Sequence, residues 1–216
     1  MKVTAVVPVY NEEKTVGNVL EVLNLSKDID EIIVIDDGST DKTPNIIKRL
    51  KTNKMEYIKL KRNIGKDNTL RNCAESINSE IVILFDSDLI GLEEHHIKNM
   101  LNTLIEEKAG MVIGLRDKGN FLANLIMPYF PLTGGERALI TNIFKEIIKI
   151  PFRERWGLEW IMNDYLKKKK LKIAKIRLEG VDHIGLQTKK YGIMAFLKQI
   201  YDFILIKIKL FGVKYD

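Results

Sequence analysis

Short runs of β-branched and other apolar residues alternate, along the first half of the chain, with segments whose apolar residues recur three or four positions apart. The first pattern is typical of buried strands, and the second of helices that cover a sheet. Strands are predicted at residues 3–9, 31–35, 57–60, 81–85 and 111–115. Helices are predicted at residues 16–26, around 46–50, at 67–77 and at 93–107. This alternation predicts an α/β fold with a mostly parallel, doubly wound sheet and right-handed crossovers.

The regular alternation ends after Leu115. The segment Phe121–Leu132 is apolar but contains two prolines, so it forms a buried connection, a loop over the site or a wall facing a second substrate. Gly134 and Gly135 follow this segment. They provide either open backbone that a ligand approaches closely, or a turn ahead of a helix that begins near Ala138.

Length and composition indicate a globular protein. The chain has 216 residues, 45% of them hydrophobic and 30% charged, which is enough for one large α/β domain or for a domain with a small appendage. Its single cysteine, Cys73, excludes an internal disulfide and indicates a reducing compartment, so we expect a cytoplasmic protein. We expect no signal peptide, because Met1-Lys2 leads straight into an apolar strand, and no membrane-spanning helix, because no run of about 18 apolar residues occurs.

The positive charge is concentrated in the last third of the chain. Residues 145–216 contain 17 Lys and Arg against 8 Asp and Glu, whereas the remaining residues contain 18 and 21. The run Lys167–Lys170 lacks interleaved aromatic residues and is typical of a solvated helix end, so nucleic acid is not an expected partner. An amphipathic helix is predicted over 191–216. Its apolar stretch packs on the sheet, forms a homodimer contact or lies peripherally against the inner face of a membrane.

The acidic triplet Asp86-Ser87-Asp88 directly follows the predicted strand 81–85. In an open α/β sheet, ligands bind just beyond the carboxyl ends of the strands. Two carboxylates spaced i and i+2 in an extended segment lie on the same side, which suits a divalent cation that bridges to phosphate oxygens. Such a triplet also ends many strands on a solvated turn. The rest of the chain decides between these two interpretations.

Three further motifs lie, like the acidic triplet, at a strand end or in the turn that follows it. The four motifs in order are Val7-Pro8-Val9-Tyr10-Asn11-Glu12-Glu13, Val34-Ile35-Asp36-Asp37-Gly38-Ser39-Thr40-Asp41, Asn63-Ile64-Gly65-Lys66 and Asp86-Ser87-Asp88. With these motifs, residues 3–88 resemble a family 2-type glycosyltransferase. The resemblance implies a Rossmann-like, doubly wound domain of the GT-A fold.

The second half of the chain resembles a narrower group, the glucosyl-3-phosphoglycerate synthases and related short transferases. The matching segments are Pro131-Leu132-Thr133-Gly134-Gly135-Glu136-Arg137-Ala138-Leu139, Pro151-Phe152, Trp156-Gly157-Leu158-Glu159 and Val181-Asp182-His183. From this resemblance we expect a GT-A domain over 1–190, with a donor half over 1–115 and an acceptor half over 116–190.

The resemblance implies that the donor half binds a nucleotide-diphosphate sugar, with UDP or GDP as the carrier. Short polar groups at strand ends can hydrogen-bond a base edge and sugar hydroxyls. The residues implied in donor binding are Pro8, Tyr10, Glu12, Asp37, Lys66, Asp86 and Ser87. Lys66 would place a positive charge near the diphosphate or base. Where the family usually has a second glycine after this lysine, the chain has Asp67.

The resemblance also implies a metal site that is formed by Asp88 and His183 and holds Mn²⁺ or Mg²⁺. The chain has three histidines, and the other two, His95 and His96, come shortly after the acidic triplet. A cation offsets the negative charge that develops on the departing nucleoside diphosphate. Asp88 is therefore also a candidate catalytic residue.

The acceptor half is implied to hold the second substrate and a catalytic base. The residues implied in acceptor binding are Arg116, Thr133, Gly134, Gly135 and Arg137. The guanidinium groups among them match phosphate or carboxylate geometry. An inverting transferase needs a carboxylate base near the acceptor hydroxyl, for which Glu136 and Glu159 are the candidates. A retaining enzyme would not need that base, and both stereochemical courses stay open.

The sequence therefore predicts a metal-dependent glycosyltransferase that moves a hexose from a nucleotide sugar to a hydroxyl or phosphate acceptor. The resemblance favours a small anionic acceptor of the 3-phosphoglycerate kind. One alternative is transfer to a polyprenyl phosphate or another membrane lipid, which the basic, apolar C-terminal stretch favours. The other is a protein that binds sugar nucleotides without catalysis.

Overall fold

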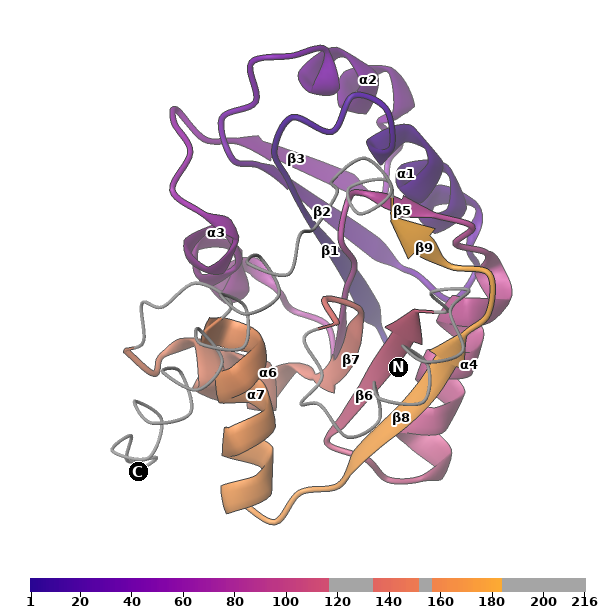
Figure 1. The fold of residues 1–216 in the computed structure, drawn as a ribbon, viewed down its shortest axis with the longest axis vertical. Helices are drawn as coiled ribbons and strands as arrows, with labels where there is room; N and C mark the ends of the chain where they lie inside the picture. Colours follow the sequence, from indigo (N-terminus) through magenta and orange to yellow (C-terminus); the bar gives the residue numbers. More distant parts are fainter. Residues whose placement is uncertain (117–133, 152–156, 184–216) are drawn as a thin grey trace, which may run out of the picture.

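A seven-stranded sheet runs through the centre of the protein (Figure 1). The computed structural model describes residues 1–116, 134–151 and 157–183. The strands of this sheet are β1 (Val3–Val9), β2 (Glu31–Asp36), β3 (Met55–Lys59), β4 (Ile81–Leu84), β6 (Met111–Arg116), β7 (Arg137–Ile140) and β8 (Ile173–Leu178). They lie in the order β3-β2-β1-β4-β7-β6-β8, and β7 is antiparallel to both of its neighbours. Two short strands, β5 (Leu89–Ile90) and β9 (Asp182–His183), form a separate antiparallel pair.

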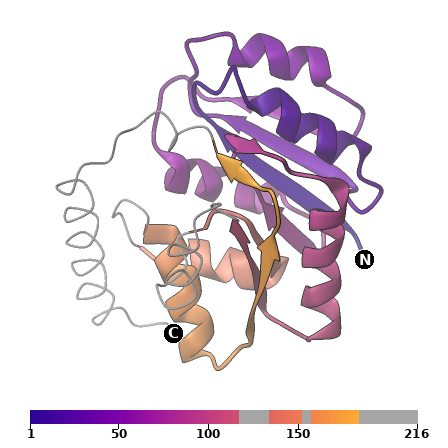
Figure 2. The ribbon, with the colours of Figure 1, turned by 45° about the vertical axis from the view of Figure 1, so that its right-hand side comes forward.

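Helices cover both faces of the sheet (Figure 2). One face carries α1 (Val16–Leu25), α2 (Thr43–Leu50) and α4 (Glu94–Glu106). The other carries α3 (Lys66–Cys73), the short 3₁₀ helix η1 (Ala74–Ser76), α6 (Thr141–Ile148) and α7 (Gly157–Lys168). Successive strand residues point to opposite faces, so Ala5 and Val7 pack in the first core while Val6 packs in the second. The prediction of a mostly parallel, doubly wound sheet in a single domain is confirmed.

The strand order reverses between β1 and β4, which lie side by side and parallel. From β1 the chain winds outward through β2 to β3, and it then crosses back to β4 on the other side of β1. In doubly wound folds, ligands bind at such a switch point, beyond the carboxyl ends of the two strands. The turn after β1 and the acidic triplet after β4 both lie at this edge.

Pro8 lies within the central strand β1, where a proline would normally remove a ladder hydrogen bond. The carbonyl of Val6 accepts from the N–H of Phe85, on the β4 side, and the carbonyl of Val9 accepts from Asp37, on the β2 side. Backbone polar groups of successive strand residues point to opposite sides, so the nitrogen of Pro8, like the groups of Val6, faces β4. There β4 has already ended, since its last pair joins Leu84 to Val6, and no donor is needed.

The structure corrects two boundaries that the pattern predicted. The helix expected over 67–77 ends at Cys73 and continues as η1. The helix expected to begin near Ala138 begins at Thr141, because residues 137–140 form β7. Ala138 pairs with Ile83 on one side and with Val112 on the other, so this four-residue run fills the gap between β4 and β6. A run this short has no periodicity that separates a strand from a helix.

Some predicted features lie outside the described residues. These are Thr133, the apolar segment Phe121–Leu132 and the C-terminal helix predicted over 191–216. Within the described ranges, none of the helices combines the length and the apolar character that crossing a bilayer requires.

Candidate active site

Asp86 is the centre of a group of charged side chains at the carboxyl end of β4. Its Oδ1 lies 2.6 Å from Nζ of Lys66, at the start of α3, and its Oδ2 accepts from Arg116 at the end of β6. Burial alone would raise the pKa of Asp86, but Lys66 and then Arg116 outweigh it and hold this pKa well below its usual range. Asp86 is therefore a fixed negative charge, and its side chain is still 20% exposed.

The group extends to two more carboxylates from the second half of the chain. Glu136 accepts two hydrogen bonds from Arg116, at 2.9 Å from Nε and 2.7 Å from one terminal nitrogen. Oε1 of Glu159, on α7, lies 3.1 Å from Nζ of Lys66. Three carboxylates thus share two cations, and residues far apart in sequence meet at one point. We name these five residues, Lys66, Asp86, Arg116, Glu136 and Glu159, the charged cluster.

The two predicted catalytic bases differ in what their oxygens bind. Glu136 is fully buried, and both of its oxygens are held by Arg116. Burial raises the pKa of Glu136, and Arg116 opposes that rise. Glu159 is also buried, but its Oε2 has no hydrogen-bond partner among the residues that the structure describes. Leaving a buried carboxylate oxygen unsatisfied is costly, so of the two candidate bases Glu159 is the one that keeps an unused hydrogen-bond acceptor among the described residues.

Gly135 gives Asp86 the room to reach both cations. A Cβ at Gly135 would lie 2.4 Å from each carboxylate oxygen of Asp86. Any other residue here would displace that carboxylate. One predicted role of Gly134 and Gly135 was to let a ligand approach the backbone closely. In the structure, the group that lies close to Gly135 is the carboxylate of Asp86.

Arg137 points into the interior of the protein. It is fully buried, its Nε donates to the carbonyl of Gly134 at 3.0 Å, and one terminal nitrogen donates to Asn163 at 2.9 Å. Burial lowers the pKa of Arg137 to about 10. The predicted acceptor cation thus sits in the core, where it fastens the segment before β7 to α7. Arg116, the other predicted acceptor cation, is held between two carboxylates in the charged cluster.

Asp37 shapes the loop that leads to Lys66. Its two oxygens accept from the N–H groups of Ile64, at 2.7 Å, and of Gly65, at 2.9 Å. Gly65 has a φ of 88°, which a glycine adopts without strain. Asp37 thus lies directly after β2, as the sequence predicted. Its role in holding the loop before Lys66 was not predicted.

The turn after β1 brings Glu12 toward the acidic triplet. Glu12 accepts from the Thr15 hydroxyl at 2.9 Å, and its own N–H donates to Thr43 at 2.8 Å. Burial raises the pKa of Glu12, and the charge of Asp88 adds to that rise. In the same turn Tyr10 is 43% exposed and presents its ring to solvent.

Asp88 differs from Asp86 in having no fixed partner among the residues that the structure describes. It is half-buried in the turn after β4 and makes no hydrogen bond or ion pair within the described ranges, while Ser87 beside it is buried. The next residue, Leu89, pairs with His183 across β5 and β9. The backbone therefore brings Asp88, which directly precedes β5, close to His183 in β9, and the structure describes only the backbone of His183. Among described side chains, no group of three His, Cys, Asp or Glu has metal-binding geometry.

Asp67 is a site residue whose role the sequence did not predict. Its Oδ2 accepts from the N–H of Leu158 at 3.2 Å, so the start of α3 binds the start of α7. Lys66, which precedes Asp67, forms an ion pair with Glu159, which follows Leu158, so the same two helix starts are joined twice. Burial, and then the charge of Glu159, raise the pKa of Asp67 to about 6. The departure from the family pattern at this position was the one available signal.

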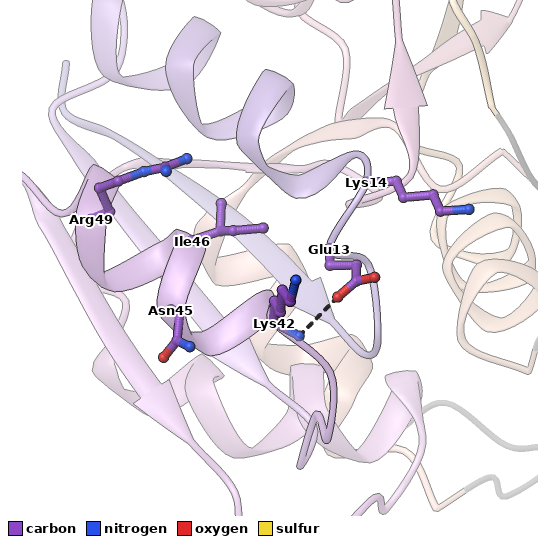
Figure 3. A pocket seen from close by; sticks show the side chains of 6 residues that line it. All are labelled: Glu13, Lys14, Lys42, Asn45, Ile46 and Arg49. Atoms are coloured by element: carbon purple, nitrogen blue, oxygen red, sulfur yellow. Dashed lines mark hydrogen bonds between the residues drawn. The ribbon is translucent and has the colours of Figure 1, made fainter.

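A surface pocket of about 550 Å³ lies between the turn before α1 and helix α2 (Figure 3). It is lined by Glu13, Lys14, Lys42, Asn45, Ile46 and Arg49. Figure 3 shows Lys14 pointing away from Arg49, so the cations do not converge on one point. The lining residues include none of the predicted site residues, and we place the candidate active site at the charged cluster and Asp88.

Fold and site together define an α/β protein that gathers carboxylates and cations beyond the carboxyl ends of its parallel strands, as nucleotide-binding enzymes do. The family model for glycosyl transferase family 2 matches residues 4–168. The chain belongs to this family, and it is a glycosyltransferase.

Individual relatives are more distant. An uncharacterized protein of Methanocaldococcus jannaschii is 28% identical over 232 residues, covering 96% of this chain and 93% of that protein. A poly-beta-1,6-N-acetyl-D-glucosamine synthase of Staphylococcus aureus is 30% identical over 128 residues, covering 57% of this chain and 31% of that enzyme.

The fold is also that of solved structures. Glucosyl-3-phosphoglycerate synthase from Mycobacterium tuberculosis, in complex with Mn²⁺, uridine-diphosphate and glucosyl-3-phosphoglycerate, matches with a TM-score of 0.75 and 21% identity. The match covers 99% of this chain and 81% of that one. The same enzyme with Mg²⁺ and uridine-diphosphate matches with a TM-score of 0.71 and 21% identity, covering 95% of this chain and 79% of that one. The predicted GT-A fold is thereby confirmed.

Proposed function

We propose that the protein transfers a hexose from a UDP-sugar to a small phosphorylated acceptor, with Mn²⁺ or Mg²⁺ as cofactor. The observation that carries this proposal is the contrast within the acidic triplet. Asp86 is fixed by two cations, whereas Asp88, beside the strand that contains His183, makes no hydrogen bond with any residue that the structure describes. A hard divalent cation prefers such an oxygen ligand, and an imidazole beside it favours Mn²⁺.

The donor diphosphate would lie between Asp88 and Lys66, beyond the ends of β1 and β4. Asp88 and His183 would hold the cation there, and the cation would stabilise the charge on the departing diphosphate. Asp86 keeps the ammonium group of Lys66 protonated and oriented, since their atoms are 2.6 Å apart. Tyr10 and Glu12 line the same edge and are the groups that we assign to the nucleoside.

Glu159 is the stronger candidate for the carboxylate that contacts the acceptor hydroxyl or the sugar. Its Oε1 is oriented by Lys66, and its buried Oε2 has no hydrogen-bond partner among the described residues. A general base must have a free oxygen within hydrogen-bond reach of the proton that it removes. Glu136 has none, because Arg116 holds both of its oxygens, so we assign it to the support of Arg116 and Asp86.

A phosphorylated acceptor agrees with the fold of the glucosyl-3-phosphoglycerate synthase structures, one of which contains phosphoglyceric acid. It also agrees with the excess of Lys and Arg over residues 145–216. Arg116 and Arg137 already bind groups within the protein, so we assign the acceptor phosphate to other Lys or Arg side chains. The proposed acceptor class is therefore supported by the fold and the charge distribution. The proposed donor and metal are supported by the geometry of the site.

A transfer assay with labelled UDP-glucose and Mn²⁺ tests the proposal. We expect a labelled, phosphatase-sensitive product with 3-phosphoglycerate and no comparable product with glycerate. GDP- and ADP-glucose serve as donor controls. Labelled lipid with vesicles that contain polyprenyl phosphate, and no product with 3-phosphoglycerate, would instead favour the lipid acceptor. Donor binding without transfer or hydrolysis under any of these conditions would contradict catalysis.

A further inference from the structure

His96 connects the helix that follows the acidic triplet to the segment that carries His183. It is the third residue of α4 and is buried, with 2% of its surface exposed. Its Nδ1 accepts from the N–H of Glu93 at 3.0 Å, and its Nε2 lies 3.0 Å from the carbonyl oxygen of Glu179. Because Nδ1 accepts, Nε2 carries the proton and donates it to that carbonyl. Both ring nitrogens of the neutral imidazole are therefore used.

The chain after Glu179 lies directly against the chain after Asp88. A Cβ at Gly91 would lie 2.3 Å from the carbonyl oxygen of Gly180, so the two backbones touch. Two residues further on, β9 pairs with β5, with His183 opposite Leu89. His96, the Gly91–Gly180 contact and this pairing thus follow one another along residues 179–183. We name this stretch the Glu179–His183 segment.

We propose that His96 is a positioning residue that holds the Glu179–His183 segment against β5 and so keeps His183 beside Asp88. The inference rests on the proposed function, because it takes Asp88 and His183 as metal ligands. The physical reason is the shortness of the pairing that holds His183. Leu178 anchors the start of the segment in β8 and Val181 is buried, but an isolated pair of two-residue strands is marginal in water. A side chain that ties Glu179 to a helix therefore helps to order the connection that leads into β9.

A second role of His96, as the capping residue of α4, must be separated from this one. The side chain of Glu93 and the ring of His96 form a reciprocal capping box at the helix start. Gln at the third position is a standard capping-box residue and accepts the same N–H, but it is too short to reach Glu179 as well. His96→Gln therefore keeps the cap and removes the bond to the segment. His95→Gln is the matched control for a change at the helix start, because the exposed His95 ring contacts His96 and Glu93.

Binding of Mn²⁺ in the presence of UDP, followed through the EPR signal of free Mn²⁺, provides the test. Loss of one hydrogen bond predicts about fivefold weaker Mn²⁺ binding in His96→Gln, with the melting temperature close to wild type. The Mn²⁺ concentration for half-maximal turnover should rise equally, while turnover at saturating Mn²⁺ is retained. A purely structural role would lower turnover and stability without this selective shift. His95→Gln should bind as wild type does.

Two glycines offer an independent test without touching a histidine. Gly91 and Gly180 both have a φ of 74°, so an alanine is strained at either position. The added Cβ collides with the segment at Gly91 but meets nothing within 4 Å at Gly180. Gly91→Ala should therefore weaken Mn²⁺ binding more than Gly180→Ala does.

The outcomes separate the inference from the proposed function. If His183→Ala binds Mn²⁺ as tightly as wild type, the proposed metal site is wrong and the inference falls with it. If His183→Ala loses binding but His96→Gln matches the His95→Gln control, the metal site stands and the role of His96 is refuted. Equal effects of Gly91→Ala and Gly180→Ala would also count against the inference.

Discussion

Replacing Asp67 by Asn removes a charge that the fold disfavours while it keeps the shape of the side chain. The carbonyl oxygen of Asn can still accept from the N–H of Leu158, which Asp67 does at 3.2 Å. Burial, and then Glu159, raise the pKa of Asp67 from 3.8 to about 6, against the opposing effects of Leu158 and Lys66. The ionised carboxylate is therefore less favourable in the folded protein than in the unfolded chain.

The sign of the pH dependence follows from this shift. Between pH 3.8 and about 6 the folded wild type binds more protons at Asp67 than the unfolded chain does, so its stability falls as the pH rises. Asp67→Asn lacks this fall. The shift sets an upper limit of about 3 kcal/mol, and we expect about 1 to 2 kcal/mol after solvent screening.

Urea unfolding of both proteins at several pH values between 4 and 8 measures the difference. The variant should be more stable than wild type above pH 6, and its advantage should fade as the pH falls toward 4. Glu106→Gln, which removes a carboxylate from an exposed position at the end of α4, controls for net charge. A variant that is less stable than wild type at pH 7.5, or a difference that does not change with pH, would refute the reasoning.

Three further substitutions test the interior of the site. Gly135→Ala should lower the free energy of unfolding by about 2 to 3 kcal/mol, because its Cβ displaces the carboxylate of Asp86. The control Gly17→Ala, in α1, should raise this free energy by up to about 1 kcal/mol, because its Cβ makes only ordinary contacts with α2. Arg137→Met should cost about 2 to 4 kcal/mol in urea unfolding, since it leaves buried acceptors unpaired; a cost below about 0.5 kcal/mol would place this side chain outside the core network. Glu159→Gln should fold normally and lower turnover by about 100-fold, and unchanged turnover would remove it from the reaction.

Local patterns were sufficient to predict the fold of residues 1–116. Each apolar run that ends at a polar turn became a strand of the parallel sheet, and the acidic triplet lies beyond β4, as predicted. This succeeds because β1, β2 and β4 are buried on both faces, so their composition alone identifies them. The edge at which Glu12, Asp37 and Asp86 lie follows from the parallel order of those strands.

The contacts between the two halves could not be predicted in this way. Asp86 binds Lys66 and Arg116, and Lys66 binds Glu159, across separations that local periodicity does not report. β7 is too short to have a period, and it is antiparallel in a sheet that otherwise favours parallel neighbours. Arg137 was expected at the acceptor because a guanidinium group matches phosphate or carboxylate geometry. Its burial depends on Asn163, a polar partner from α7.

The dependence of sugar transfer on Asp88 and a divalent cation tests the central claim most directly. Transfer from UDP-glucose should stop in EDTA, return with added Mn²⁺, and fall by at least about 100-fold in Asp88→Asn. The Glu106→Gln control, which removes one carboxylate from an exposed helix end, should stay within about twofold of wild type. Full activity in EDTA, or an Asp88→Asn variant with wild-type turnover and Mn²⁺ response, would contradict the account.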